Sequence, residues 1–278
     1  MKVVRHDTAA QLLDRAGAWL EHAEAENNLI LGIAAYFKSH TGQLKVAPHF
    51  LTVDDNGTIV GAALMSPPRQ LLISDMPDPA VISLADYMLA ESATVAGLVG
   101  RNSKAELFAD YWASRTGQSC RIRMMERLYA CATVPPLTYA SGRLRPATAD
   151  DEALLSKWCA QFCIDARIKN EIAFFKARLP HKIADGSLSV WETDEVVSMA
   201  AIERELPRGA ALSWVFTPAH VRRQGYATSC VAALTQRMLD SGKKFCCLYT
   251  DLANPTSNSI YQKIGYRPVY DVQDWRFE

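Results

Sequence analysis

The residues from 222 to 227 most constrain this chain, because they join a predicted strand directly to a predicted helix. The strand covers residues 211–217, and Pro218 ends it because proline has no amide hydrogen for the sheet ladder. A helix follows, since apolar side chains recur at helical spacing as far as Met238, and Gly242 stands where a left-handed residue would end it. The pattern predicts an α/β fold in which a tight turn of small residues begins a helix.

This turn has the properties of an anion-binding site. The first N–H groups of a helix have no intrahelical partner, and the helix dipole places partial positive charge beside them. Gly225 and Ala227 leave the backbone accessible, and Arg222 and Arg223 add two positive charges. We therefore expect a phosphate or pyrophosphate group here; the alternative is a solvated turn without a ligand.

Two motifs resemble the acyl-CoA site of the GNAT superfamily of N-acetyltransferases. Arg222, Gly225 and Ala227 fill the pattern Q/R-x-x-G-x-G/A of that family's pyrophosphate loop. Residues 254–266 read N-x-x-S-x-x-x-Y-x-x-x-G-Y, close to the family's N-x-x-A-x-x-x-Y-x-x-x-G-F. The chain also resembles tandem-GNAT bacterial proteins, with a C-terminal half similar to the glycine N-acyltransferase-like branch. The resemblance implies acetyl-CoA (coenzyme A) as cofactor.

The same resemblance implies which residues bind the cofactor. The backbone of Val215 and Thr217 would pair with the pantetheine arm as an added strand does, and the backbone N–H groups from Arg223 to Ala227 would hold the pyrophosphate. Asn254 would hydrogen-bond the pantetheine arm from the end of the next parallel strand. The implied binding residues are Val215, Phe216, Thr217, Arg222, Arg223, Gln224, Gly225, Tyr226, Ala227, Thr228, Asn254, Ser257 and Tyr261.

Tyr261 and Glu203 are the expected catalytic residues. A phenol with a pKa near ~10 can donate a proton to a thiolate leaving group with a pKa near ~8.5, so Tyr261 is the expected general acid. Its alternative role is a core tyrosine. Glu203 ranks first as general base, with Glu205 and Asp251 as other candidates, because the cofactor strand itself carries no acid. Each of these acids could instead be a solvated or ion-paired surface group.

Composition limits the function classes. The chain has 278 residues, enough for two domains, and equal numbers of basic and acidic residues, 30 each, so no global charge favours nucleic acid or a membrane surface. No apolar stretch is long enough to span a bilayer, and the first seven residues lack a signal-peptide core. We expect a cytoplasmic protein whose partner is a small-molecule amine acceptor; the oligomeric state stays open.

The seven cysteines predict reduced thiols and no metal site. Cys159 and Cys163 lie four residues apart on one predicted helix, which could be half of a metal site. No second pair of ligands stands nearby, so buried thiols are the favoured interpretation. Cys230 lies on an apolar helix face, where a thiolate nucleophile would be disfavoured.

The order of predicted elements suggests two GNAT-like folds in tandem, each an α/β fold with a mixed central sheet and helices on both faces. The expected domains are residues 1–134 and 143–278, joined by a linker at 133–142 that contains paired prolines. In the second copy, Asp150 or Asp151 should cap the first helix, and the second helix should cover residues 171–179. The buried face of the first of these helices should carry Leu154, Leu155, Trp158, Cys159 and Phe162.

The first copy lacks the cofactor turn. At the corresponding place, residues 74–79 contain two acids and two prolines instead of arginine and glycine. The acids place negative charge at this helix start, and the prolines leave it fewer N–H donors than the turn at 222–227 has. We therefore expect it to repel a pyrophosphate. We expect one acyl-CoA site per chain.

The resulting functional hypothesis is an acyl-CoA-dependent N-acyltransferase that transfers an acetyl group to a small primary amine by direct attack in a ternary complex. A non-catalytic acyl-CoA-binding or sensing module is the alternative. A third interpretation, compatible with both, has the first half dock a protein or peptide. Four basic residues, Arg167, Lys169, Arg178 and Lys182, suggest an acidic group on the acceptor, although a solvated helix face explains them equally well.

Overall fold

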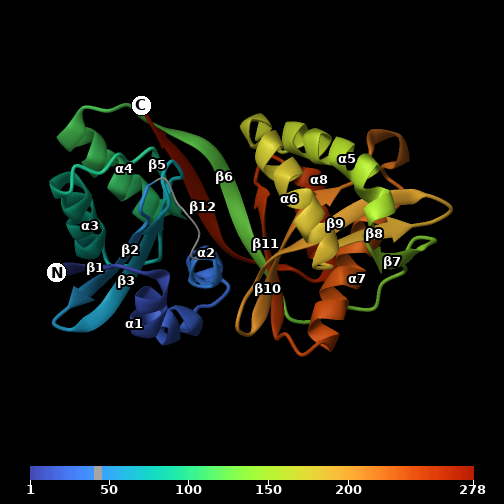
Figure 1. Ribbon diagram of the computed structural model, residues 1–278, viewed down its shortest axis with the longest axis horizontal. Helices are drawn as coiled ribbons and strands as arrows, with labels where there is room; N and C mark the ends of the chain where they lie inside the picture. The colour runs from blue at the N-terminus through green and yellow to red at the C-terminus, as the bar shows by residue number, and fades with distance from the viewer. Residues whose placement is uncertain (41–45) are drawn as a thin grey trace. The chain divides into compact units, whose positions relative to one another are not determined.

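The computed structural model describes residues 1–40 and 46–278 and divides into two compact units (Figure 1). Unit 1 comprises Met1–Leu128 and Val269–Glu278, and unit 2 comprises Tyr129–Pro268. Along the chain, one order of helices and strands occurs twice: a strand, two helices, three strands, a helix, a strand, a helix and a strand. None of the described helices combines the length and apolar composition that crossing a bilayer requires.

Unit 1 is built around the first run of this order. Its elements are β1 (Lys2–His6), α1 (Ala9–His22), α2 (Asn28–Ser39), β2 (His49–Asp55), β3 (Thr58–Met65), β4 (Leu71–Ile73), α3 (Asp78–Ala90), β5 (Gly97–Arg101), α4 (Asn102–Thr116) and most of β6 (Cys120–Cys131). β1 to β4 pair antiparallel in sequence order, and β4 pairs parallel with β5. β2 and β3 form a hairpin, from His49↔Met65 to Asp55↔Thr58, and the sequence did not indicate β1, α2 or β6.

Unit 2 repeats the order around the predicted cofactor turn. Its elements are β7 (Arg143–Pro146), α5 (Glu152–Asp165), α6 (Ile172–Ala184), β8 (Leu188–Glu192), β9 (Val196–Glu205), β10 (Gly209–Phe216), α7 (Tyr226–Asp240), β11 (Phe245–Asp251), α8 (Pro255–Ile264) and the first residues of β12 (Arg267–Phe277). Short 3₁₀ turns η1 (Ala149–Asp151), η2 (Lys169–Glu171) and η3 (Ala219–Val221) precede α5, α6 and the cofactor turn.

The unit 2 sheet is covered by helices on both faces. Successive side chains of a strand point to opposite faces, and β9 follows this rule. Ala200 and Ile202 pack in the apolar cluster that contains α7 and α8 residues, whereas Met199 and Ala201 pack in the cluster that contains α5 and α6 residues. β7 to β10 pair antiparallel, and β10 pairs parallel with β11, so the sheet is mixed.

The final strand of each run of elements contributes to the other unit. β12 pairs antiparallel with β5, from Val272↔Arg101 to Arg276↔Gly97, so residues 269–278 belong to unit 1. β6 stands beside β11 in the sheet, and its last residues, 129–131, belong to unit 2. These units therefore differ from the expected domains 1–134 and 143–278. Strand pairing between residues far apart in sequence carries no local sequence signal.

The segment at 133–142 is also attached to unit 2, rather than lying free as a linker. The Ala140 amide donates to Ser229 Oγ at 2.8 Å, and the Trp191 indole donates to the Ser141 carbonyl at 2.9 Å. Tyr139 stacks on Trp191 with a centroid separation of 6.1 Å. The boundary between the units falls inside β6, before Pro135 and Pro136 of this segment.

The first two helices of unit 2 depart from the sequence prediction in three details. Asp151, one of the two expected caps, stands at the N-cap position of α5, but its side chain makes no cap hydrogen bond there; it instead completes a capping box with Thr148, the N-cap of η1, by accepting from the Thr148 amide at 2.8 Å. Leu154 is exposed, because the buried stripe of α5 runs instead through Leu155, Trp158, Cys159 and Cys163. α6 continues through Pro180 to Ala184, beyond the expected end.

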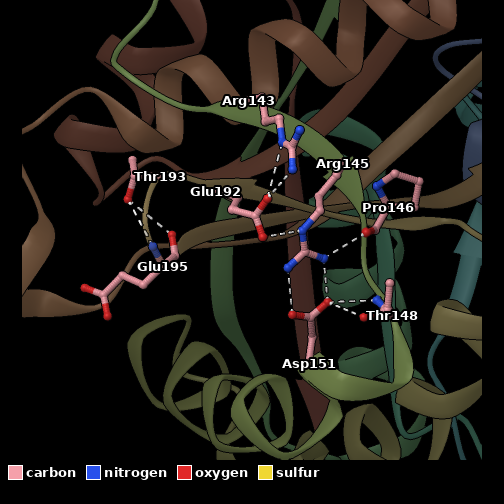
Figure 2. Close-up of polar contacts among 8 residues, drawn as sticks. All are labelled: Arg143, Arg145, Pro146, Thr148, Asp151, Glu192, Thr193 and Glu195. Carbon is pink, nitrogen blue, oxygen red and sulfur yellow. Dashed lines mark hydrogen bonds and ion pairs between the residues drawn. The ribbon is translucent and has the colours of Figure 1, made fainter.

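The Arg145 guanidinium joins this capping box to the edge of the sheet (Figure 2). It contacts both oxygens of Asp151, at 2.6 and 2.9 Å, and donates to Glu192 on β8 at 2.6 Å. Because Arg145 donates hydrogen bonds to it, the pKa of Asp151 is lowered. This network fixes the short edge strand β7 to α5.

We expect Asp151→Asn to lower the free energy of unfolding by about 1–3 kcal/mol at neutral pH, since it removes one of the two carboxylates that the partly buried Arg145 guanidinium contacts. A carboxyl with a lowered folded-state pKa stabilises above its unfolded-state pKa of ~3.9 and loses that effect as pH falls through the folded value. Denaturant titrations should therefore show a wild-type–variant difference that shrinks at acidic pH. Asp150→Asn, an exposed neighbour, is the control; a pH-independent difference would contradict the expectation.

Candidate cofactor turn and catalytic residues

The turn before α7 has the backbone geometry of an anion-binding loop. Arg223 and Gly225 both have positive φ, 65° and 84°, and Gly225 is the N-cap of α7. No side chain caps the helix and no acid lies in its first turn. The first helical hydrogen bond joins the Ser229 amide to the Gly225 carbonyl at 2.9 Å. The amides of the preceding first-turn residues therefore have no intrahelical partner and are available to an anion.

Of the two arginines at the turn, Arg222 is used within the unit. Its Nε donates to the Thr217 carbonyl at 2.8 Å, and its Nη2 pairs with Asp165 at the end of α5 at 2.6 Å. The guanidinium also lies 5.8 Å from the centre of the Phe216 ring. Arg222 therefore ties the turn to α5. Arg223 is exposed and, within the described residues, has no ion-pair partner, which leaves its charge available to a ligand.

β10 leaves the regular sheet at the place where the sequence predicted pantetheine binding. Within the described residues, the parallel ladder with β11 ends at Ala211↔Cys247, although β10 continues to Phe216 and β11 to Asp251. The antiparallel ladder with β9 shifts register between Ser213 and Phe216, so that Trp214 and Val215 together face Ala200. This is a β-bulge, and it frees backbone groups for another strand-like partner.

The bulge also reverses which face the β10 side chains occupy. Ala210 and Leu212 pack in the α7–α8 cluster, whereas Trp214 and Phe216 pack in the α5–α6 cluster. In a regular strand these alternate residues would all share one face. Trp214 has φ 58°, a left-handed conformation that is rare for a bulky residue, and it is fully buried. Nothing in the sequence pattern indicated this bulge.

Tyr261 lies in the α7–α8 cluster, against which Val215 and Tyr226 also pack. Its side chain is 7% exposed, and burial raises its pKa. The phenol therefore keeps its proton throughout the physiological range, as a hydrogen-bond donor must. Tyr129 is a neighbour that the sequence did not indicate: its ring centre lies 6.5 Å from that of Tyr261, and its hydroxyl donates to Asn258 at 3.0 Å.

Glu203 lies on the opposite face of the sheet, in an ion-paired setting. Its carboxylate pairs with Arg178 and with Lys182, the latter at 3.2 Å, and accepts from the Trp214 indole at 2.8 Å. Burial alone would raise the pKa of Glu203, but the two cations outweigh it and the net shift is downward. These contacts make Glu203 a weak proton acceptor. The same contacts occupy Arg178 and Lys182, two of the four basic residues that suggested an acidic group on the acceptor.

The remaining predicted site residues lie around the ends of β10 and β11. Asn254 is the N-cap of α8, and its side chain accepts from the Ser257 amide at 3.1 Å. The Phe216 carbonyl accepts from Ser198 Oγ at 3.0 Å, and the Thr217 hydroxyl lies 2.9 Å from Ser198 Oγ. Gln224 Oε1 accepts from the Tyr226 hydroxyl at 3.1 Å, while Ala227 and Thr228 lie in the first turn of α7.

The corresponding turn of unit 1 differs in charge and in its free donors. Pro77 precedes α3, Pro79 lies in its first turn, and Asp78 adds a carboxylate there. Asp78 pairs with Lys104 at 2.6 Å, and Asp75 pairs with Arg101 at 2.5 Å. The acids and prolines are thus at the helix start, as the sequence indicated, and both carboxylates are ion-paired with basic side chains of β5 and α4.

The cysteines of unit 2 are buried thiols. Burial raises the pKa of Cys159 to about 12, of Cys163 to about 11 and of Cys230 to about 12. A thiolate is therefore disfavoured at each position. Over residues 1–40 and 46–278, no group of three or more His, Cys, Asp or Glu side chains is placed to hold a metal ion.

Comparisons with known proteins agree with this architecture. The family model of FR47-like proteins matches residues 190–275, which run from β8 into β12. No significant match was found among curated proteins.

Solved structures match nearly the whole chain. A GNAT-family acetyltransferase from Colwellia psychrerythraea is 14% identical, with a TM-score of 0.59 and 100% of both chains covered. A GCN5-related N-acetyltransferase from Sphaerobacter thermophilus is 13% identical, with a TM-score of 0.65, covering 99% of this chain and 95% of that one. A tandem GNAT protein from the clavulanic acid biosynthesis pathway is 12% identical, with a TM-score of 0.56, covering 100% and 98%.

These likenesses confirm the fold class expected from the sequence, α/β with two GNAT-like folds in tandem. The chain thus has the fold of the GNAT acetyltransferases, and its residues 190–275 match the FR47-like family.

Proposed function

We propose that this protein is an acyl-CoA-dependent N-acyltransferase, with acetyl-CoA as donor and a small primary amine as acceptor. The observation that carries the proposal is the uncapped start of α7, where Gly225 and Arg223 adopt left-handed conformations and the first-turn amides have no partner within the helix. The GNAT fold supports acyl-CoA as the ligand of such a turn.

The residues present fit a CoA thioester in three further respects. The bulge at Trp214 and Val215, together with the end of the β10–β11 ladder at Ala211↔Cys247, leaves backbone groups for the amides of a pantetheine arm. Arg223 supplies a positive charge beside the amides that would face the pyrophosphate. Asn254, already the cap of α8, would offer its remaining side-chain hydrogen-bonding capacity to the arm.

In the proposed reaction, the neutral acceptor amine attacks the thioester carbonyl directly while both substrates are bound. The C–N bond forms as the C–S bond breaks, Tyr261 donates its phenolic proton to the departing CoA thiolate, and the proton that the amine nitrogen loses passes to water, from which the phenol regains one. Burial raises the pKa of Tyr261, so the phenol is protonated before the step. Cys230 is not a candidate nucleophile, since burial raises the pKa of its thiol to about 12. Because the Glu203 carboxylate is ion-paired, we assign it a structural role in the site and not the role of general base.

A thiol-release assay with acetyl-CoA and a panel of amines, amino acids, polyamines and aminoglycosides tests the proposal. Amine-dependent release of free CoA would support it. The second candidate, a non-catalytic acyl-CoA-binding module, is favoured by one observation: the leading candidate base, Glu203, is held by Arg178 and Lys182. Tight CoA binding without release on any amine would favour that module.

We expect calorimetry to give one CoA bound per chain. Neither helix start has a side-chain cap, but that of α3 carries Asp78 and two prolines, whereas the first turn of α7 contains no acid. Two equivalent sites per chain would contradict this account of the unit 1 turn. As a control, Asp78→Ala should leave the stoichiometry at one, because the prolines still limit the donors of α3.

A further inference from the structure

The pairing of β9 with β10 contains two neighbouring bulges, and a hydrogen bond connects a side chain of one bulge to a side chain of the other. The first register shift, between Ala211 and Leu212, leaves Glu203 of β9 as the extra residue. The second leaves an extra residue at Trp214–Val215 of β10. The Trp214 Nε1 donates to Glu203 Oε2 at 2.8 Å, so one side-chain hydrogen bond connects the two irregular places.

Buried groups of α6 hold this connection in place. Lys182 is 5% exposed, and its Nζ donates to the carbonyl of Ile202, next to the first bulge, at 2.7 Å. The same amine pairs with Glu203 at 3.2 Å and lies 5.6 Å from the centre of the Trp214 ring. The Phe175 ring packs against the Trp214 indole, with a distance of 4.6 Å between the ring centroids. A charged group and an aromatic ring of α6 thus fix the rotamer of one tryptophan.

The backbone at Trp214 needs such support. A left-handed φ in a bulky residue costs on the order of 1–3 kcal/mol and persists only where surrounding contacts hold it. The expected alternative for an unsupported strand is a regular register, which would place Trp214 on the α7–α8 face and return Val215 to the β9 ladder. The hydrogen bond from Trp214 to Glu203 and the contact of Lys182 with the indole ring oppose this return to a regular register.

We propose that Trp214 and Glu203 are positioning residues, whose hydrogen bond holds the β10 bulge open and so presents the backbone of Val215 to the pantetheine arm of acyl-CoA. This inference rests on the proposed function, since it concerns the same strand. It assigns Glu203 a role in cofactor affinity that a general base would not have, because CoA binding involves no proton transfer from the acceptor.

Three single variants and one double variant of the 278-residue chain separate these roles. Trp214→Phe keeps a ring but removes the indole N–H, and Glu203→Ala removes the acceptor oxygen. Each should raise the calorimetric Kd for CoA about tenfold. Glu203→Gln keeps an acceptor oxygen and should bind CoA within about threefold of wild type. Since the two residues act through one bond, the Trp214→Phe/Glu203→Ala double variant should be little worse than either single variant.

A second readout needs no cofactor. Hydrogen exchange of the apo protein should be faster at the amides of residues 213–217 in Trp214→Phe and Glu203→Ala, but not in Glu203→Gln. Trp112→Phe is the matched control, because its indole is also buried and donates to a side-chain oxygen, Gln118 Oε1, at 2.7 Å in unit 1. Thermal melts report any general loss of folding.

The outcomes distinguish the inference from the function on which it rests. Unchanged CoA affinity and unchanged exchange in folded Trp214→Phe would overturn the positioning role while leaving the acyltransferase proposal intact. Loss of turnover in Glu203→Gln with normal CoA affinity in Glu203→Ala would overturn it in favour of a general base. A wild-type protein that binds no CoA would overturn the proposed function, and this inference with it.

Discussion

Gly225→Val is expected to weaken CoA binding about 100-fold, or roughly 2.7 kcal/mol. Gly225 has φ 84° at the N-cap of α7, and a Cβ there would meet only Ala140, at an ordinary 3.7 Å. The requirement for glycine is therefore conformational. A β-branched residue is a genuine outlier at positive φ, so valine should turn the peptide and redirect the first-turn amides that the pyrophosphate would use. Calorimetric titration with CoA measures the effect.

Gly186→Val provides the matched control. Gly186 also has a left-handed φ, 72°, with no atom within 4 Å of the place that a Cβ would occupy, and it lies between α6 and β8. Both variants should lose similar stability from backbone strain, and only Gly225→Val should lose affinity. Equal CoA affinities for the two variants would argue that the turn does not contact the cofactor.

Tyr261→Phe is expected to lower kcat about 100-fold with little change in the Kd for CoA. The substitution removes only the hydroxyl, so the packing of the ring with Tyr129 and Tyr266 should persist. Burial raises the pKa of this phenol, so the alkaline limb of the pH–rate profile should not come from Tyr261. Steady-state kinetics of thiol release over a range of pH provides the measurement.

The control for this variant is Tyr266→Phe. Tyr266 is fully buried in the same cluster, and its hydroxyl forms a hydrogen bond with the Thr235 hydroxyl at 2.8 Å. Removing the Tyr266 hydroxyl should therefore lower stability but leave kcat unchanged. If Tyr261→Phe turns over at the wild-type rate, the proton for the leaving thiolate comes from elsewhere, and Tyr261 is a core residue.

The predictable features of this protein are local ones. A glycine between a strand and an amphipathic helix indicated the turn at 225, and the structure adds that this glycine is left-handed. Spacing of apolar residues likewise predicted α7, and the acids and prolines at 74–79 predicted the altered turn of unit 1. In each case the residues that determine the structure lie within about one turn of each other.

The features that escaped prediction depend on distant partners. Arg222 was expected beside a phosphate, yet Asp165, 57 residues earlier, engages its guanidinium. Trp214 looked like an ordinary strand residue, because its bulge depends on Glu203 of another strand and Lys182 of a helix. Long-range pairs of this kind leave no periodicity in the sequence, so only the folded structure reveals them.

The exchange of final strands makes the two halves of the chain depend on each other for folding. Tyr129 and Cys131, which come from the last strand of the first run, are buried in the core that contains Tyr261. Conversely, β12, the last strand of the second run, pairs with β5 in unit 1. Neither run of elements therefore contains all the residues of one unit, and a chain cut between the two runs would give two incomplete cores.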